Sequence, residues 1–303
     1  MTFQGHDIIE LSLDGSHLRA APQIGARLLT WQVGGHDLIH WPADADWSHP
    51  AKVRGGNPLL FPFLGRHRVD GEIGKWRDHD GNVYALPAHG FARDSVFAVT
   101  ANTTSPKPSV TMTLTDSPAT RAVYPFAFSF SAVFTLLSAD TLEVSLVTEN
   151  RGDTPMPYYA GHHFYFVLPH DLRAGTTIDL PPTTRRFHQP DGALSAPEPG
   201  ERRYTLDEAR IQDRFHVIDA VPNADRTVSV RTPALGRTIE FDLRDSPAPW
   251  YAVTTWTENE QSDFFCVEPW LGLPDAIHNG TGLRWVAPGA TETATLRLTA
   301  RFD

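Results

Sequence analysis

Glu268 is the first residue of this chain whose surroundings favour acid/base chemistry. It ends the apolar run 264–267 and is followed by Pro269 and Trp270. Burying an ionised carboxylate costs free energy unless donors meet it, and burial raises its pKa towards that of a general base near neutral pH. Pro269 stops strand pairing directly after Glu268, and Trp270 can stack on the apolar face of a sugar ring. A buried salt bridge with an arginine is the structural alternative for Glu268.

Two adjacent histidines, His162 and His163, lie in the aromatic segment 160–168. Neighbouring residues on a strand point to opposite faces, so only one of the two rings can face a given pocket. The same alternation argues against both serving as ligands of one metal ion. A structural histidine with its hydrogen bonds satisfied is the alternative for either ring.

Arginines and a third histidine occur in two segments rich in glycine and proline, 54–66 and 86–93. Arg66 ends the first segment, and His89 and Arg93 lie in the second. The glycines beside them allow backbone to come close to a ligand. Taken singly, each arginine could instead pair with a surface carboxylate.

Several kinds of active site are absent from the sequence. It has no Gly-x-Ser-x-Gly elbow, no phosphate-binding Gly-x-x-x-x-Gly-Lys and no Gly-x-Gly-x-x-Gly. The single cysteine, Cys266, lies in an apolar run that disfavours a thiolate. A carboxylate, histidines, arginines and aromatic residues remain, and these suit acid/base chemistry on a polar, uncharged ring.

Together the segments resemble the aldose 1-epimerase (galactose mutarotase-like) family. The resemblance runs in the family's order from about residue 50 to about residue 290. The matching motifs are Asn57-Pro58, Phe61-Pro62 and Gly65-Arg66, then His89-Gly-Phe-Ala-Arg93, then Gly161-His-His-Phe-Tyr-Phe166, and finally Glu268-Pro-Trp-Leu-Gly272 with Asp275.

The resemblance implies a role for several residues. Glu268 matches the general base, His163 the general acid, and His89 a histidine near the sugar ring oxygen. Arg66 matches a hydroxyl-binding arginine, and Asp213 resembles an aspartate that holds sugar hydroxyls. The other expected sugar-binding residues are Asn57, Arg93 and Trp270. No redox, phosphate or metal cofactor is implied.

The same resemblance does not identify which sugar is the substrate. His67-Arg68 stands where the galactose enzymes have Asn-Arg, and Arg54-Gly-Gly resembles the hexose-6-phosphate epimerase branch. Arginines that could bind a phosphate are Arg54, Arg66, Arg68 and Arg93. The alternatives to a free-sugar epimerase are therefore a hexose-6-phosphate 1-epimerase, a non-catalytic carbohydrate-binding protein, and a lyase or other activity on the same scaffold.

Composition restricts the partners. The 303 residues contain 26 Lys+Arg and 36 Asp+Glu, a formal net charge of −10, which argues against nucleic acid. One cysteine, no apolar stretch long enough for a bilayer and no export signal predict a cytoplasmic protein without a membrane partner. We expect a small-molecule sugar as the ligand and a monomer or homodimer.

The elements that must position these residues are predicted to be strands. With 25 Pro and 22 Gly scattered along the chain, long helices are disfavoured and an all-β fold is expected. We expect one domain over 1–303, and the resemblance implies a large antiparallel β-sandwich, or supersandwich. One short helix is expected at 205–209, with Thr205 as its cap and Glu208 three residues on. The expected strands are 8–13, 27–33, 96–100, 110–114, 128–136, 141–147, 228–230, 239–243, 251–256 and 293–298.

Overall fold

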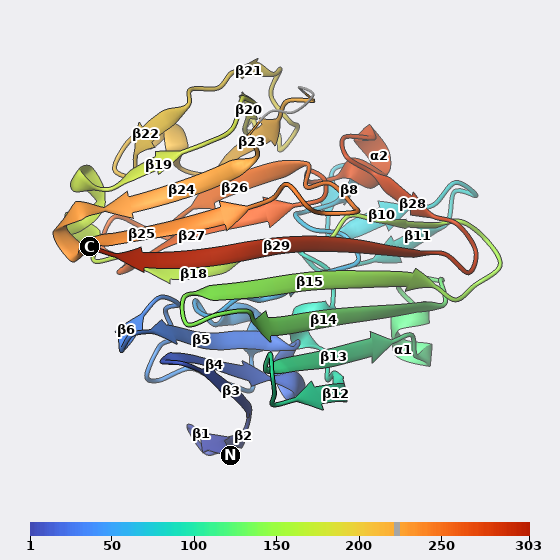
Figure 1. Ribbon diagram of the computed structural model, residues 1–303. Coiled ribbons are helices and arrows are strands. Elements are labelled where there is room, and N and C mark those ends of the chain that lie inside the picture. The colour runs from blue at the N-terminus through green and yellow to red at the C-terminus, as the bar shows by residue number, and fades with distance from the viewer. Residues whose placement is uncertain (221–224) are drawn as a thin grey trace.

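Two large antiparallel sheets dominate the computed structural model, which describes residues 1–220 and 225–303 (Figure 1). The first has nine strands, in the order β12 (Ala98–Thr103), β13 (Ser109–Thr115), β14 (Phe128–Leu136), β15 (Thr141–Asn150), β29 (Thr291–Phe302), β25 (Arg237–Asp242), β24 (Thr227–Thr232), β19 (Thr177–Asp179) and β22 (Arg203–Thr205).

The second large sheet has eight strands. Its order is β21 (Glu198–Pro199), β20 (Thr183–Arg186), β23 (Arg214–Ile218), β26 (Ala252–Trp256), β27 (Phe264–Trp270), β17 (Gly161–His162) and β7 (Leu59–Leu60), with β18 (Phe164–Val167) also paired to β27. A smaller four-stranded sheet contains β3 (Ile9–Leu13), β4 (Ser16–Ala21), β5 (Arg27–Val33) and β6 (His36–Asp37).

Short elements complete the described part of the chain. The two-stranded pairs are β1 (Thr2–Phe3) with β2 (His6–Asp7), β8 (Arg68–Val69) with β9 (Glu72–Ile73), β10 (Lys75–Arg77) with β11 (Val83–Ala85), and β16 (Met156–Tyr158) with β28 (Arg284–Val286). The α-helices are α1 (Pro118–Arg121) and α2 (Ala276–Asn279), and short 3₁₀-helices occur at Pro22–Ile24, Pro50–Lys52, Ala92–Asp94, His170–Gly175, Ala209–Ile211 and Pro233–Leu235.

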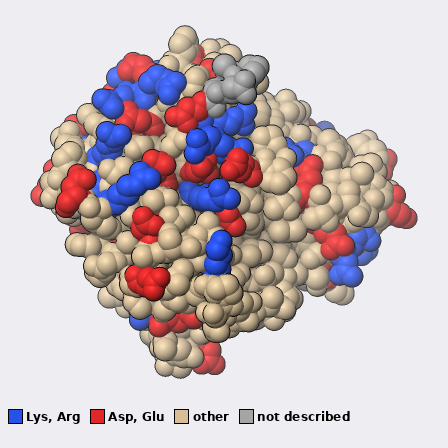
Figure 2. All heavy atoms as spheres, in the orientation of Figure 1, with Lys and Arg blue, Asp and Glu red and all other residues tan. Residues whose placement is uncertain are grey.

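The nine-stranded sheet has one buried and one solvated face. Strands β14 and β15 alternate strictly between buried and half-buried positions, as the polar/apolar alternation of their sequence requires. Their inward residues join a core that reaches the other sheet, where Phe130 stacks on Phe61 with ring centroids 4.1 Å apart. The outward face carries cross-strand ion pairs such as Glu143–Arg297 and Glu240–Arg301, and Figure 2 shows acidic and basic groups interspersed there.

Strand β27 differs because it is buried along its whole length. It stays paired with β26 through Pro269 to Trp270, so the expectation that pairing stops after Glu268 is wrong. Phe265 and Val267 point into the main core, whereas Phe264 and Cys266 pack with Tyr165 on the other face. Alternation places Glu268 on that second face. An ionisable residue is thus held inside the protein by a strand that is apolar on both sides.

The predicted all-β sandwich is confirmed, and each of the expected strands overlaps an observed one. The helix expected at 205–209 is wrong. Thr205 ends β22, and the Glu208 carboxylate accepts a hydrogen bond from the Thr205 amide at 2.7 Å, so the predicted cap closes a turn instead. None of the helices in the described part of the chain has the length and apolar character needed to cross a bilayer.

Candidate active site

A cavity of about 410 Å³ lies on the face of the eight-stranded sheet that carries Glu268, a size within the range of about 300–1,000 Å³ usual for small-molecule sites. It is lined by Arg27, Ala51, Val53, Arg54, Pro58, Gly65, Arg66, Ala88, His89, Arg93, His163, Tyr165, His188, Asp213, Phe215, Thr254, Trp256, Glu268, Trp270 and Pro274. Seven of the eight residues expected at the site therefore line the same cavity.

Glu268 lies deep in the cavity and is 1% exposed. Burial, and next the charge of Asp213, raise its pKa well above the ordinary carboxyl value. Within the described residues, its Oε2 atom has no hydrogen-bond partner. Thr254, its cross-strand neighbour on β26, is also buried with an unpartnered hydroxyl. These polar atoms are available to a ligand in the cavity.

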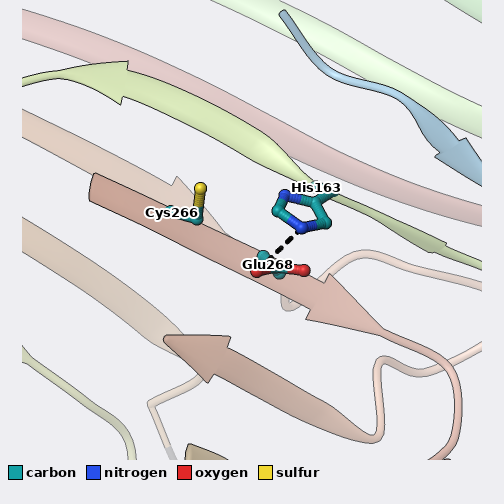
Figure 3. A group of neighbouring side chains, drawn as sticks. All are labelled: His163, Cys266 and Glu268. Carbon is teal, nitrogen blue, oxygen red and sulfur yellow. Dashed lines mark ion pairs between the residues drawn. The ribbon is translucent and has the colours of Figure 1, made fainter. Parts of the chain in front are cut away.

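His163 faces Glu268 from the short connection between β17 and β18, with Nε2 3.5 Å from Glu268 Oε1 (Figure 3). The Tyr165 ring stacks on the His163 ring, with centroids 4.7 Å apart and planes 8° from parallel. Burial, followed by the charges of Arg93, Arg54 and Arg27, lowers the pKa of His163 to about 3. The ring is held in place and neutral.

Asn57 does not line the cavity, although a direct sugar contact was expected of it. It is fully buried, and its Oδ1 accepts from the His163 amide at 2.9 Å while its Nδ2 pairs with His162 Nδ1 at 3.0 Å. His162 is fully buried and packs on Phe164, away from the cavity. Asn57 therefore positions the two histidines from behind the cavity wall.

His89 enters the cavity from a loop that is fixed to the strands beside it. Its backbone has φ = 67°, and the Gly65 amide donates to its Nδ1 at 3.2 Å. Because Nδ1 accepts this hydrogen bond, Nε2 carries the proton of the neutral ring and can donate. Burial, and next the Arg93 charge, lower the pKa of His89 well below its ordinary value.

Four guanidinium groups line the same cavity: Arg27, Arg54, Arg66 and Arg93. Arg27 is 1% exposed, and burial lowers its pKa to about 10. Its Nη2 donates to the Pro50 carbonyl at 2.9 Å, whereas its Nε and Nη1 have no partner within the described residues. The Arg54 guanidinium forms an ion pair with Glu258, with Nε 2.8 Å from Oε1. The cavity thus presents more donors than its own residues use.

Aromatic rings and one carboxylate form the remaining wall. The Trp270 ring lies 5.6 Å from that of Phe215 and 6.2 Å from that of His89. Asp213 is exposed at the cavity rim, in a turn with φ = 52° just before β23. A sugar on these rings would have hydrogen-bonding groups around its edge and an apolar surface against its face.

The comparison with known families agrees with this geometry. Residues 8–299 match the model of a family described as aldose 1-epimerase. The chain belongs to this family.

Solved structures share the fold of this chain, and a curated protein matches its sequence. The structure of Slr1438 protein from Synechocystis sp. PCC 6803 superposes with a TM-score of 0.84 at 24% identity, covering 100% of this chain and 99% of that one. A galactose mutarotase related enzyme from Lactobacillus acidophilus gives 0.80 at 23% identity, covering 97% of each chain. Protein LacX (chromosomal) of Lactococcus lactis subsp. lactis is 24% identical over 256 residues, 79% of this chain and 80% of LacX.

Three side chains at this site are of types that bind metal ions. The ligand atoms of His163, Cys266 and Glu268 lie within 4.8 Å of one another (Figure 3). Burial, however, raises the pKa of the Cys266 thiol well above its ordinary value. The nearby arginine charges that lower the pKa of His163 also disfavour a dication. The positive charge around the three groups therefore disfavours a metal ion among them.

Residues in the cavity that sequence analysis missed are Arg27, Tyr165, His188 and Thr254. Tyr165 and Thr254 carried a usable signal, because each lies on the same face of its strand as a predicted site residue or directly across from one. Arg27 begins β5 in the separate four-stranded sheet, and His188 lies beyond the end of β20. No nearby motif marks either of them.

Proposed function

We propose that this protein is an aldose 1-epimerase that interconverts the α and β anomers of an aldohexose. The observation that carries the proposal is the facing pair of Glu268 and His163, 3.5 Å apart, inside a cavity of monosaccharide size. The anomeric hydroxyl and the ring oxygen of an aldose are bonded to the same carbon. Two groups at this separation can therefore reach both oxygens at once.

In the proposed reaction, Glu268 removes the proton of the anomeric hydroxyl while His163 gives a proton to the ring oxygen. The bond between the anomeric carbon and the ring oxygen breaks, and an open-chain aldehyde forms. Rotation about the adjacent carbon–carbon bond exposes the other carbonyl face. The reverse proton transfers then close the ring to the opposite anomer. His89 Nε2 would donate a hydrogen bond beside the ring oxygen.

The proton balance follows from the opposite pKa shifts of the pair. The raised pKa of Glu268 and the lowered pKa of His163 favour a neutral carboxylic acid beside a neutral imidazole in the free site. Ring opening needs the ionised pair, and it ends in the neutral pair. Burial therefore stabilises the neutral pair, which is the state present with the open-chain sugar. The hydroxyl groups of the bound sugar ring donate hydrogen bonds to the Glu268 carboxylate, and this favours the ionised pair.

Replacing Glu268 by glutamine tests the proposal. The optical rotation of freshly dissolved α-D-glucose and α-D-galactose is followed by polarimetry, with wild-type protein and with Glu268→Gln. We expect the wild type to accelerate mutarotation and the variant to lose about 10²- to 10⁴-fold of that rate, the usual value of one proton-transfer group. The variant should still fold and bind sugar, because glutamine keeps the shape of the side chain.

A matched control makes the same substitution at a glutamate outside the cavity. Glu258→Gln removes a carboxylate that pairs with Arg54 and does not line the cavity, so its rate should stay within a few-fold of wild type. Full activity in Glu268→Gln would contradict the assignment of the base. Sugar binding without acceleration by the wild type would favour a carbohydrate-binding protein.

A second candidate function, a hexose-6-phosphate 1-epimerase, is favoured by the buried Arg27. Two of its guanidinium nitrogens have no partner among residues 1–220 and 225–303, and it shares the cavity with Arg54, Arg66 and Arg93. A neutral sugar does not compensate so much positive charge, whereas a phosphate group accepts several charge-assisted hydrogen bonds. Arg68 is not part of this set, because its guanidinium contacts the Asp191 carbonyl instead.

The same polarimetric assay, with each 6-phosphate followed in parallel by NMR exchange, separates the two candidates. A kcat/KM at least tenfold higher for the phosphorylated sugar would favour the second function. Equal or lower values would leave the free aldose as the substrate.

A further inference from the structure

The connection between β20 and β21 contributes one residue to the cavity lining, a histidine that neither the motifs nor the proposed reaction uses. His188 lines the cavity together with Asp213 and Phe215. It lies two residues beyond the end of β20, and it pairs with Leu194 in an isolated bridge that folds residues 187–195 into a hairpin. His188 is half-buried, so its ring is both supported and accessible to a ligand.

Hydrogen bonding fixes the role of each ring nitrogen. His188 Nδ1 lies 3.1 Å from the Gly192 carbonyl oxygen. A carbonyl oxygen only accepts, so Nδ1 must carry the proton. In the neutral ring, Nε2 is then an acceptor, and it has no hydrogen-bond partner within the part of the chain that the structure describes.

Packing against Phe215 and a fixed hairpin tip hold this ring in place. The His188 ring meets Phe215 edge to face, with centroids 5.1 Å apart and an interplanar angle of 87°. Arg68 holds the tip of the hairpin, because its guanidinium donates to the Asp191 carbonyl and packs closely against Gly192. The carbonyl that sets the tautomer of His188 is thus itself fixed.

The cavity also needs such an acceptor. The guanidinium groups and His89 Nε2 can only donate to a sugar, whereas every sugar hydroxyl has a proton of its own to place. Glu268 is committed to the anomeric hydroxyl in the proposed reaction. Asp213, His188 and the Thr254 hydroxyl are further acceptors that line the cavity, and a buried hydroxyl without an acceptor costs binding free energy.

We propose that His188 is a specificity-determining residue that accepts a hydrogen bond, through Nε2, from one non-anomeric hydroxyl of the sugar. The inference rests on the proposed epimerase function and adds a contact that selects the configuration at one ring carbon. A site built to pair a hydroxyl discriminates against sugars that lack it or present it in the other orientation.

The test compares two variants of the same residue across a set of sugars. His188→Phe keeps a ring against Phe215 and removes the acceptor, and His188→Gln places an amide oxygen near the position of Nε2. KM and kcat are measured for the preferred sugar and for each of its singly deoxygenated analogues. His79→Phe, which replaces an exposed histidine outside the cavity, is the matched control.

We expect His188→Phe to raise KM for the preferred sugar about tenfold, as the loss of one hydrogen bond predicts, with kcat changed less. His188→Gln should recover most of this loss. For one deoxy sugar, the one that lacks the accepted hydroxyl, the effect of His188→Phe should fall to within twofold. That sugar identifies the hydroxyl.

Two outcomes would overturn the proposal. An unchanged KM for every sugar would show that His188 does not contact the ligand. An equal loss for every deoxy sugar would show a structural role for the ring. If the wild type accelerates none of the sugars, the proposed function fails, and the same comparison made by calorimetric binding still decides the role of His188.

Discussion

Among single residues, the buried amide of Asn57 orders two histidines that point in opposite directions. It fixes the backbone of His163 through Oδ1 and the ring of His162 through Nδ2. The side chain is fully buried, so water cannot replace either partner. The correct placement of the proposed acid thus depends on a residue that never meets the sugar.

Removing this amide should destabilise the protein. Asn57→Ala leaves the His163 amide and His162 Nδ1 without partners, each at a cost of about 1–3 kcal/mol. We expect the free energy of unfolding, measured with urea, to fall by roughly 2–4 kcal/mol. The exposed Asn102→Ala on β12 should change it by less than about 0.5 kcal/mol. Similar values for both variants would contradict the role given to Asn57.

The sequence was sufficient to predict those site residues that belong to contiguous motifs. Glu268 stands out because it ends a continuous apolar run, and His163 because its spacing from Gly161 and Tyr165 matches the family motif. Arg27 could not, because its place in the cavity depends on how β5 packs against loops far away in the chain. Asn57 was predicted to contact the sugar directly, because a sequence motif does not show whether a side chain faces the cavity or lies behind its lining.

Among the elements, the loop that carries His89 is shaped by its contact with the chain beside β7. Phe61 bridges Gly90 in a parallel pairing, and its carbonyl accepts from the amides of Phe91 and Ala92 at 3.0 and 3.2 Å. A Cβ atom on Gly90, where φ is 74°, would lie 2.0 Å from that carbonyl oxygen. Only glycine allows this close approach.

Substituting this glycine should therefore displace His89. In Gly90→Ala the loop must move away from Phe61, so we expect kcat/KM in the mutarotation assay to fall by at least tenfold, with a loss of stability. Gly175→Ala, at a position with open space and an ordinary backbone conformation, is the matched control and should leave the rate unchanged. A fully active Gly90→Ala would show that the loop tolerates the shift.

In the whole molecule, buried neutral histidines link stability to pH. Burial lowers the pKa of His67 to about 4, and those of His162 and His216 to about 3. The unfolded chain, in which histidine has a pKa of about 6.5, binds more protons than the folded protein over this range. The free energy of unfolding must then decrease as the pH falls from 6.5 towards 4.

His67 offers a direct test of this link. It is fully buried against Phe63 and Tyr159, and neither ring nitrogen has a partner within the described residues. His67→Phe should reduce the pH dependence of unfolding between pH 6.5 and pH 4, without abolishing it, because His162 and His216 remain. Urea unfolding at several pH values measures the slope. The exposed His79→Phe should not alter it, and an unchanged slope in His67→Phe would refute the link.

The position of the 187–195 hairpin has a consequence for how this enzyme family can diversify. Glu268 and His163 lie at the centre of the eight-stranded sheet, where neighbouring strands constrain every residue, whereas the hairpin joins β20 to the edge strand β21. An edge connection can lengthen, shorten or exchange side chains without altering the paired strands. The proposed reaction chemistry and the proposed sugar preference thus belong to separately variable parts, and redesign of substrate scope should begin at the sheet edge.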